Sequence, residues 1–587
     1  VQIKKITFLN NKAFSDEQLK SIFQETQEGG LFSFLSGSGS FKESAFKMDL
    51  QRLTYWYLEN GYIKFRYENP VVTVSDDKKW LYVSIYIEEG TPYKIGKIDF
   101  SGDLLFTHEQ LLSDLQMGSK ETFSITKRNL DIQKLTEKVQ DLGYAFVNVI
   151  PKMEFHDDKE TVDIDYHFEK GNLVHIGEIK ILGNSKTYDH VIRRELRITE
   201  GQLYHGTQLR VSRERVERLG FFQPGEVIFN TSSRKGNEDI LDLEITIKER
   251  STGTITLGAG YGSVQGFFMT TQISEINLFG RGQNLSFQAQ YAADKTSKSF
   301  NLGFTDPYAF QTRWSMGFDL FSVNFPIPQK YLTRKLGIDV RLGYPVLEDV
   351  YGYITYKREG MSIGDKAHED IDSSLDDGSL SSVVWSVVRD KRNNRFEPTG
   401  GSYQNISLET AGLGGDKKFV KWVLNNRFYT KVVGDLVFRN STEYGHIIKI
   451  SDRDTPPAER FYLGGPNNMK GYEIFQLSPA IFHDNDDGTT TREPLGGAVE
   501  FYSLFEFEYP LIRDAGLKAV FFFDAGNTFS SFPIGGDDGL SLRTDAGFGI
   551  RWFSPIGPLR FEWGWPLHVK SGETSGPVFQ FFIGPPF

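Results

Sequence analysis

The chain of 587 residues contains no cysteine, so disulfides, thiolate nucleophiles and cysteine-ligated zinc or iron–sulfur sites are excluded. The ten histidines show no HExxH or other paired-ligand spacing, and neither a GxSxG motif nor a P-loop occurs. We therefore expect no enzyme activity, no metal site and no cofactor.

Long hydrophobic runs and clusters of basic residues are missing too. No apolar run approaches the roughly 18 residues that a transmembrane helix needs. The chain carries 66 Lys and Arg against 77 Asp and Glu, which gives a formal charge of −11, and it has no long basic stretch. An acidic chain of this kind is a poor binder of nucleic acid, so we expect no nucleic-acid partner.

Glycine and aromatic residues, in contrast, are abundant. The sequence holds 58 glycines and 14% aromatic residues, whereas all hydrophobic residues together make up only 39%. This excess without long apolar runs is typical of a membrane β-barrel, whose strands alternate between a lipid-facing and a polar side.

The first 250 residues contain an internal repeat. EEGTPYKIGKIDFSGD (88–103) resembles EKGNLVHIGEIKILGN (169–184), and KKITFLNN (4–11) matches the same strand. A helical stretch that ends at a glycine recurs in each copy as LENGY (58–62), DLGYAF (141–146) and ERLGFF (217–222). We therefore predict three domains, at residues 1–90, 91–171 and 172–250.

Each copy is predicted to be a β-α-α-β-β unit, a small sheet with two helices on one face. In the first copy a short strand precedes a helix at which Ser15 and Gln18 can form a capping box. A second helix ends at a glycine, and two alternating strands follow it. An open sheet edge of this kind can accept a partner's strand by β-augmentation, although the units could also be spacers with protected edges.

Residues 251–587 show a different pattern, in which short alternating segments are separated by Gly, Asp, Asn and Pro. At roughly 20 residues per strand and turn this length gives about 16 or 17 strands, and bacterial barrels have even numbers. A β-propeller would show a repeat of about 40–50 residues, and none is found. The sequence therefore predicts a barrel of 16 antiparallel strands.

Particular segments of both halves resemble one known family. In the first half they are DKKWLYVSIYIEEG (77–90), VIRRELRITEG (191–201), ERLGFFQ (217–223) and KERSTGTITLGAGYG (248–262). In the second half they are NLFGRGQNLSF (277–287), FTDPYAF (304–310), FEPTGGSY (396–403), FYLGGPNNMKGY (461–472) and FFFDAGNTF (521–529). Together they are similar to the outer-membrane β-barrel assembly (insertase) family, in which polypeptide-transport-associated (POTRA) domains precede a 16-stranded barrel.

This resemblance implies a fold, a location and partners. Many members of the family carry five POTRA domains, and the three units here are similar to domains 3, 4 and 5, which implies a chain shortened at its N-terminus. It also implies a barrel in the bacterial outer membrane and POTRA domains in the periplasm. The implied partners are unfolded outer-membrane protein clients, accessory periplasmic lipoproteins and outer-membrane lipids.

The family carries a Val-Arg-Gly-Phe/Tyr motif on a long extracellular loop that folds back into the barrel. Here the motif reads Met469-Lys470-Gly471-Tyr472. The resemblance implies that Lys470 pairs with Glu506 and Asp524 on the inner barrel wall, where a cation offsets the repulsion of two carboxylates. Lysine departs from the family's arginine, because it lacks the planar fork that makes bidentate contacts.

The seam between the first and last barrel strands is a second candidate site. Glycines weaken the packing of the first strand, and prolines at the chain end shorten the pairing of the last strand. We expect a lateral gate there, although many barrels have glycines and fraying ends. The candidate residues are Leu257, Gly258, Gly260 and Gly262 on the first strand and Phe579, Phe581, Ile583 and Gly584 on the last. The terminal Phe587 resembles the C-terminal aromatic of a barrel assembly signal.

The resemblance, together with these features, implies a protein that folds and inserts other β-barrel proteins. A lateral gate would expose a strand edge to a client and release the client sideways into lipid. Two alternatives stay open at this point: a TamA-like or two-partner-secretion-like translocation pore, and a passive porin with tethering modules.

Overall fold

The computed structural model describes residues 2–29, 41–262, 266–292, 297–327, 331–347, 349–366, 376–395, 397–484, 490–512, 515–531, 541–554, 557–570 and 575–583. The chain divides into two compact units, Val1–Arg250 and Ser251–Phe587. None of the helices in the described ranges is both long enough and apolar enough to cross a membrane.

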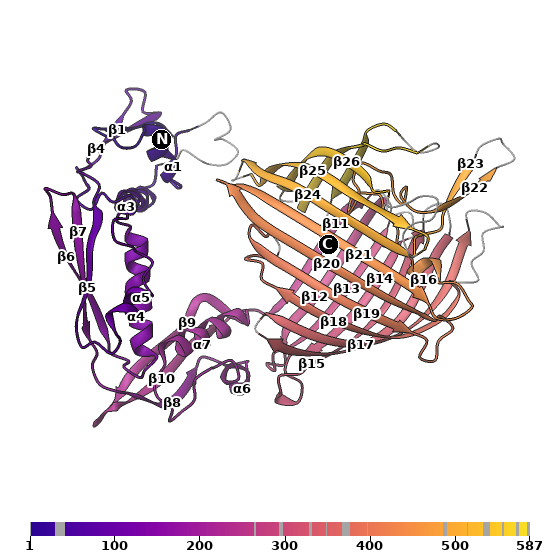
Figure 1. Cartoon of the computed structure of the whole chain (residues 1–587), viewed down its shortest axis with the longest axis horizontal. Coiled ribbons are helices and arrows are strands. Elements are labelled where there is room, and N and C mark those ends of the chain that lie inside the picture. Colours follow the sequence, from indigo (N-terminus) through magenta and orange to yellow (C-terminus); the bar gives the residue numbers. More distant parts are fainter. Residues whose placement is uncertain are drawn as a thin grey trace. The chain divides into compact units, whose positions relative to one another are not determined.

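The first unit consists of three β-α-α-β-β domains, which confirms the predicted fold (Figure 1). The first domain holds β1 (Gln2–Leu9), α1 (Asp16–Ile22), α3 (Glu43–Glu59), β2 (Arg66–Tyr67), β3 (Val71–Val74) and β4 (Trp80–Glu88). The second holds β5 (Lys94–Gly102), α4 (His108–Leu112), α5 (Ile125–Gln140), β6 (Asn148–His156) and β7 (Thr161–Glu169). The third holds β8 (His175–Leu182), α6 (Asp189–Arg193), α7 (Gly206–Arg218), β9 (Phe222–Arg234) and β10 (Asn237–Glu249).

All three sheets share one topology. The last strand of each domain (β4, β7 or β10) lies in the middle, parallel to the first strand and antiparallel to the strand that precedes it. In the first domain that preceding strand is interrupted, so β2 and β3 both pair with β4. Each sheet therefore has two outer edges, one on its first strand and one on the strand before the last.

Strand alternation and helix caps explain why these segments fold as they do. Along β4, Val83, Ile85 and Ile87 are buried beneath the helices, whereas Tyr82 and Tyr86 face outward. Ser15 and Gln18 form the predicted capping box at the start of α1, and Thr107 and Gln110 form the same box at α4.

Successive domains are joined by the same contact, between the end of one domain's long helix and the residue that precedes the first strand of the next domain. The amide of Tyr93 donates to the carbonyl of Gly61 at 2.9 Å, and the amide of Val174 donates to the carbonyl of Gly143 at the same distance. Both glycines have positive φ values, of 90° and 102°, which explains why glycine ends each long helix. The repeat in the sequence therefore marks a repeated junction as well as a repeated domain.

An acidic residue beside each junction glycine caps the long helix of the next domain. Glu59 accepts hydrogen bonds from the hydroxyl of Ser124 and the amide of Thr126 at the start of α5. Asp141 accepts from the amide and hydroxyl of Thr207 at the start of α7. Carboxylates at a helix N-terminus satisfy unpaired amides and favourably oppose the helix dipole.

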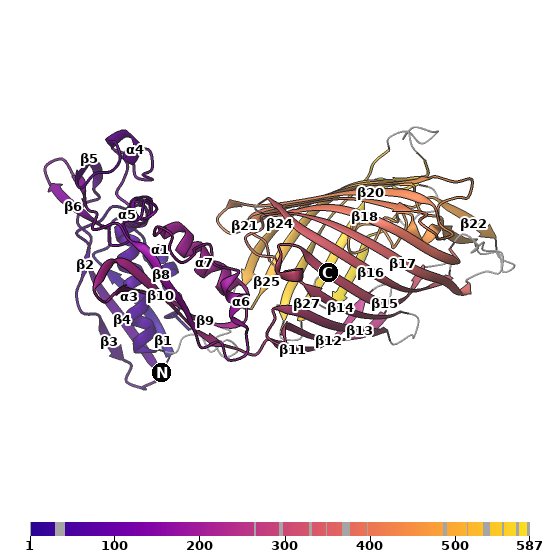
Figure 2. The same cartoon turned by 90° about the horizontal axis from the view of Figure 1, so that it is seen from below.

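The second unit is a closed barrel of 16 antiparallel strands, as the sequence predicts (Figures 1 and 2). Its strands are, in ring order, β11 (Gly253–Gly262), β12 (Gly266–Leu278), β13 (Gln283–Ala292), β14 (Lys298–Asp306), β15 (Ser315–Ile327), β16 (Tyr331–Leu347), β17 (Val350–Lys366), β18 (Gly378–Asp390), β19 (Gly401–Ala411), β20 (Phe419–Val433), β21 (Leu436–Lys449), β24 (Val499–Ile512), β25 (Leu517–Phe529), β26 (Arg543–Ser554), β27 (Gly557–Pro566) and β28 (Val578–Ile583). In addition to the ring strands, this unit contains the short helices η1 (Ala309–Gln311) and η2 (Pro457–Glu459) and the hairpin of β22 (Ala480–Asp484) and β23 (Thr490–Pro494).

Alternation along the strands separates an apolar outer face from a charged interior. On β16, Leu336, Ile338 and Leu342 are exposed on the outer face, whereas the side chains of Lys335 and Asp339 are largely buried and form ion pairs. An outer apolar band around a polar lumen is the arrangement that lets a β-sheet span a bilayer.

Candidate functional site

The long connection between β21 and β24 lies partly inside the barrel and carries the predicted motif. Lys470 is only 1% exposed, and its Nζ lies 2.9 Å from Asp524 on β25 and 3.1 Å from Glu506 on β24. The same Nζ lies 4.5 Å from the centre of the Phe522 ring, where a cation is attracted to the ring face. The structure thus brings together the motif cation and both predicted acidic partners.

Arg551 on β26 supplies the planar fork that Lys470 lacks. Its two terminal nitrogens each donate to one oxygen of Glu506, both at 2.9 Å. One of these nitrogens also reaches Glu562 on β27 at 2.8 Å. Glu506 is therefore held by a bidentate arginine from the wall and by a lysine from the loop, and the lysine adds the bond to Asp524.

The other residues of the motif fit the wall closely. A Cβ on Gly471 would stand 2.4 Å from the Cβ of Asp545, and one on Gly564 would stand 2.6 Å from the Cα of Gly471. Only glycine permits this approach of loop to wall. Met469 and Tyr472 are fully buried, and the Tyr472 hydroxyl lies 2.9 Å from the carbonyls of Thr544 and of His568.

Sequence reasoning missed several charged residues of this wall. Glu508, Asp545 and Glu562 are buried, and Arg439, Arg551, Arg560 and Lys518 form ion pairs with wall carboxylates. The alternation of charged and aromatic residues in RFEWGW (560–565) marks inward positions, but it does not say which of them meet across strands.

The seam between β11 and β28 is the weakest strand pairing of the described ring. Ten residue pairs join β11 to β12 and six join β27 to β28, whereas a single pair, Tyr261 with Ile583, joins β11 to β28. Among the described residues, positions 253–260 of β11 therefore have no strand partner on the seam side. This leaves a row of backbone groups on β11 that another strand could pair with.

The predicted seam residues lie on both sides of this short contact. Leu257 is 75% exposed on the outer face of β11, and Gly258, Gly260 and Gly262 lie on the same strand. The ring of Phe581 on β28 lies 5.8 Å from that of Tyr261 and 6.5 Å from that of Phe579. Ile583 is the last described residue, so Gly584 and Phe587 lie outside the described residues.

Gln580 connects the two predicted sites, and sequence reasoning missed it. This buried side chain on β28 points into the barrel, and its Nε2 donates to the carbonyls of Lys470 and Tyr472 at 3.4 and 3.3 Å. The last strand of the ring is thus bonded to the motif of the folded-back loop.

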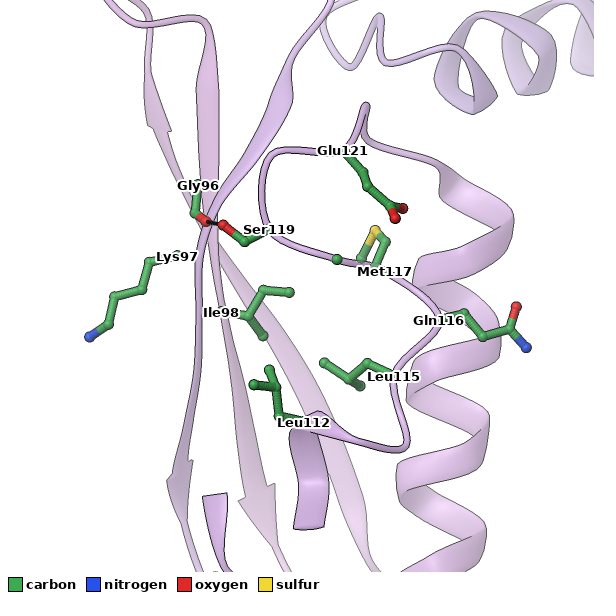
Figure 3. Close-up of a pocket in the computed structure, with 10 residues that line it drawn as sticks. Gly96, Lys97, Ile98, Leu112, Leu115, Gln116, Met117, Ser119 and Glu121 are labelled. Atoms are coloured by element: carbon green, nitrogen blue, oxygen red, sulfur yellow. Dashed lines mark hydrogen bonds between the residues drawn. The ribbon is translucent and has the colours of Figure 1, made fainter. Parts of the chain in front are cut away.

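A pocket of about 660 Å³ lies in the second repeat domain, between β5 and the connection from α4 to α5. In Figure 3 the side chains of Ile98, Leu112 and Leu115 point toward one another in it, whereas Lys97 points away. The hydroxyl of Ser119 donates to the carbonyl of Gly96 at 2.7 Å and covers part of the edge of β5. Within the described ranges no group of three or more metal-ligating side chains occurs, here or elsewhere.

Comparisons with known proteins agree with this architecture. The Omp85 superfamily domain matches residues 277–587, and the POTRA family, described as a surface antigen variable number repeat, matches residues 1–90, 93–171 and 174–250. The outer membrane protein assembly factor BamA of Nitratidesulfovibrio vulgaris is 30% identical over 99% of this chain and 73% of its own. BamA of Neisseria meningitidis serogroup B is 28% identical over 100% of this chain and 78% of its own. The crystal structure of Haemophilus ducreyi BamA lacking POTRA domains 1–3 has a TM-score of 0.63 at 22% identity, over 84% of this chain and 99% of that one.

Proposed function

Because this chain belongs to the BamA family within the Omp85 superfamily, we propose that it folds and inserts β-barrel proteins into the bacterial outer membrane. In this proposal the repeat domains lie in the periplasm, where they receive unfolded clients and bind accessory lipoproteins. The barrel contacts outer-membrane lipids through its apolar outer face. The observation that carries the proposal is the weak seam, at which a single residue pair, Tyr261 with Ile583, joins the first and last strands of the ring.

Client capture is proposed to occur by β-augmentation at β3. This strand, Val71–Val74, is exposed along its whole length and pairs with β4 on one side only among the described residues. The backbone amide of Ser75 donates to the carbonyl of Trp80. Antiparallel alternation therefore turns the amides of Val72 and Val74 away from β4. Two outward amides on a β-branched strand form a template for an incoming strand.

The other sheet edges are better protected, which favours β3 as the capture site. The outer edge of each first strand is covered, in the first domain by the amide of Gly29 bonded to Ile3 and in the others by the bridges Lys94 to Thr122 and His175 to Leu203. The remaining edges, on β6 and β9, contain proline, which cannot donate a ladder hydrogen bond.

Insertion is proposed to proceed through the seam as a lateral gate. The unpaired stretch of β11 would template the first strand of a client, and the short pairing with β28 would yield as the client strands accumulate. Burial of apolar strand faces in lipid and closure of backbone hydrogen bonds supply the driving force, so no nucleotide hydrolysis or covalent step is required.

A TamA-like or two-partner-secretion-like pore is the alternative function. A pore requires the folded-back loop to leave the lumen, whereas the buried contacts of Lys470 hold that loop against the wall. This observation favours the insertase over a permanently open channel.

Reconstitution separates these functions. The purified chain in liposomes should accelerate the folding of an unfolded barrel client, followed by heat-modifiable gel mobility, and should show no stable conductance. A folding rate equal to that in empty liposomes would refute the insertase function. A large stable conductance with one translocated substrate would support the pore.

A disulfide across the seam tests the gate. Because the chain has no cysteine, Tyr261→Cys with Ile583→Cys forms a single defined bridge that should stop insertion until it is reduced. Leu257→Cys with Thr271→Cys, on the paired strands β11 and β12, is the matched control and should stay active. Full activity of the oxidised seam variant would argue against a gate at this position.

A further inference from the structure

The folded-back loop touches the barrel at a second place, eleven residues before Lys470. There the short helix η2 brings Glu459 to the wall, where its side chain is buried and its Oε1 lies 2.8 Å from the Nζ of Lys335 on β16. The Nζ of Lys421 on β20 donates to the main-chain carbonyl of Glu459 at 2.9 Å. One loop residue is thus held through its carboxylate and its backbone by two lysines from different strands.

Further contacts hold the residues around Glu459 in place. The amide of Ala458 donates to Oδ1 of Asp376 at 2.9 Å, and the hydroxyl of Tyr462 donates to the carbonyl of Pro457 at 3.0 Å. The Nζ of Lys421 also lies 4.7 Å from the centre of the Phe461 ring. Residues 457–462 are therefore held at their backbone, their carboxylate and an aromatic ring.

The charges around Glu459 show why a buried carboxylate is tolerated here. Lys335 lies between Glu459 and Glu359, with the second distance at 3.5 Å. A neighbouring pair, Lys357 with Glu409, lies 3.1 Å apart on β17 and β19. Ion pairs of this kind add little net stability over apolar packing, but removing one partner is costly because the other charge stays buried. These ion pairs therefore favour one arrangement of the loop, because any other arrangement would leave a buried charge without its partner.

The two places of contact involve different parts of the ring. Glu459 is held by Lys335 on the sixth strand, β16, and by Lys421 on the tenth, β20. Lys470 is held by Glu506 on the twelfth strand, β24, and by Asp524 on the thirteenth, β25. The carboxylate of Glu459 therefore meets a strand that is six or seven positions away from the strands that hold Lys470, in a ring of 16.

We infer that Glu459, held by Lys335 and Lys421, is a second anchor of the folded-back loop and makes the loop a brace across the barrel. The two anchors have opposite polarity: the loop offers a cation to an acidic wall at Lys470 and an anion to lysines at Glu459. This polarity permits only one direction of the loop across the lumen, because the reversed loop would place like charges together. Glu459 and its lysines are positioning residues.

The brace would also restrain the proposed gate. Only this part of the inference rests on the proposed function. The acidic wall includes β24 to β27 and adjoins β28, whereas the lysine wall belongs to the half of the ring away from the seam. A loop fixed at both walls limits how far the seam side can move relative to the opposite side. Release of either anchor would free the seam side.

Thiol labelling in the cysteine-free chain tests the second anchor. Thr455→Cys places a reporter in a buried position beside η2, and Ser478→Cys places one in a buried position on the other side of the motif. Maleimide labelling of the folded barrel in detergent then reports the opening of each region separately. Folding of every variant is verified by heat-modifiable mobility.

Glu459→Gln should raise the labelling rate at the first reporter by on the order of tenfold, because hydrogen bonds to charged groups are stronger than neutral ones. Lys335→Met should raise the labelling rate at least as much, because it removes the contact with Glu359 as well. The double variant should label no faster than Lys335→Met, because that variant has already removed the ion pair that Glu459→Gln removes. Glu459→Asp keeps the charge on a shorter side chain. Its labelling rate at the first reporter should lie between those of Glu459→Gln and the parent. The second reporter should change by less than threefold in all of these variants.

Asp454→Asn is the matched control, because it removes an exposed ion pair with Lys449 from the same loop and should leave labelling unchanged. Equal labelling in Glu459→Gln and the parent, or additive effects of the two single variants, would overturn the anchor. Client insertion measured on the same samples tests the gate separately. Faster labelling with unchanged insertion would keep the anchor but would mean that the anchored loop does not limit movement at the seam.

Discussion

Lys470→Met is the sharpest perturbation of the acidic anchor, because methionine keeps much of the length of lysine and removes its charge. In the parent chain, Asp524 is fully buried and accepts hydrogen bonds from the side chain and the amide of Lys470. Asp545 lies directly opposite Asp524 on the neighbouring strand and is also fully buried. Without the lysine, a buried carboxylate beside a second one loses its cation.

The size of the effect follows from these contacts. Removing one partner of a buried ion pair costs about 3–5 kcal/mol, because the remaining charge stays desolvated. Glu506 contributes little to this loss, since Arg551 still holds it with two hydrogen bonds. Lys470→Met combined with Asp524→Asn removes both charges and should recover most of the loss.

Hydrogen exchange of the loop measures this free energy directly. When local opening is fast relative to exchange, a loss of about 3 kcal/mol raises the exchange rate of the amides of residues 463–477 by roughly 100-fold. Lys449→Met, which removes an exposed ion pair with Asp454, is the matched control and should change the rate by less than about threefold. The barrel strands should keep their protection in every variant.

Two results would refute this reasoning. One is an exchange rate in Lys470→Met within about threefold of the parent, which would mean that the loop is held without its cation. The other is a double variant as fast as Lys470→Met, which would mean that the unpaired carboxylate is not the source of the loss.

The remaining predictions concern the capture edge, the seam and the junction between domains. Val72→Pro removes an outward amide of β3 and should weaken client binding at least tenfold in a pull-down, whereas Val72→Thr keeps the amide and should bind normally. Gln580→Leu removes the bonds from β28 to the loop and should speed exchange of the amides of β28 several-fold; unchanged exchange there would mean that the bond to Tyr472 does not restrain the seam. Burial raises the pKa of Glu59, but hydrogen bonds from Thr126 and Ser124 outweigh it and bring the pKa below its ordinary value of 4.5. The junction should therefore be stabilised above pH 4.5, by about 1 kcal/mol relative to Glu59→Gln, and this advantage should vanish as the pH falls through the lowered pKa. Hydrogen exchange of the amides at the start of α5 measures this stabilisation. A difference between the parent and Glu59→Gln that does not change with pH would contradict the prediction.

Much of the fold and part of the site could be predicted because they depend on local patterns. The repeat of glycines, the capping residues and the alternation of strands each act over a few residues, so they can be recognised in the chain alone. Short motifs identify Lys470, Glu506 and Asp524, and the structure places the Nζ of Lys470 within 3.1 Å of both carboxylates.

Arg551, Gln580 and Glu459 could not be found in this way. Arg551 meets Glu506 across 45 residues, Gln580 reaches Lys470 across 110, and Glu459 meets Lys335 across 124. Strand alternation places Arg551 and Gln580 on inward positions, but it does not apply to Glu459, which lies in the short helix η2. The partner of each residue depends on how the strands are staggered around the ring and on where the loop returns.

The amino-acid sequence alone decides which residues form strands and helices, which face of each strand is apolar, and that three small domains precede a barrel. These properties follow from backbone conformation and from a side-chain period of two or 3.6 residues, which are local. Only the tertiary structure decides that a single residue pair joins the first and last strands, and that anchors of opposite charge hold the folded-back loop at two places on the inner wall. Those features depend on strand register and ring closure, which arise when distant segments meet and which no local pattern encodes.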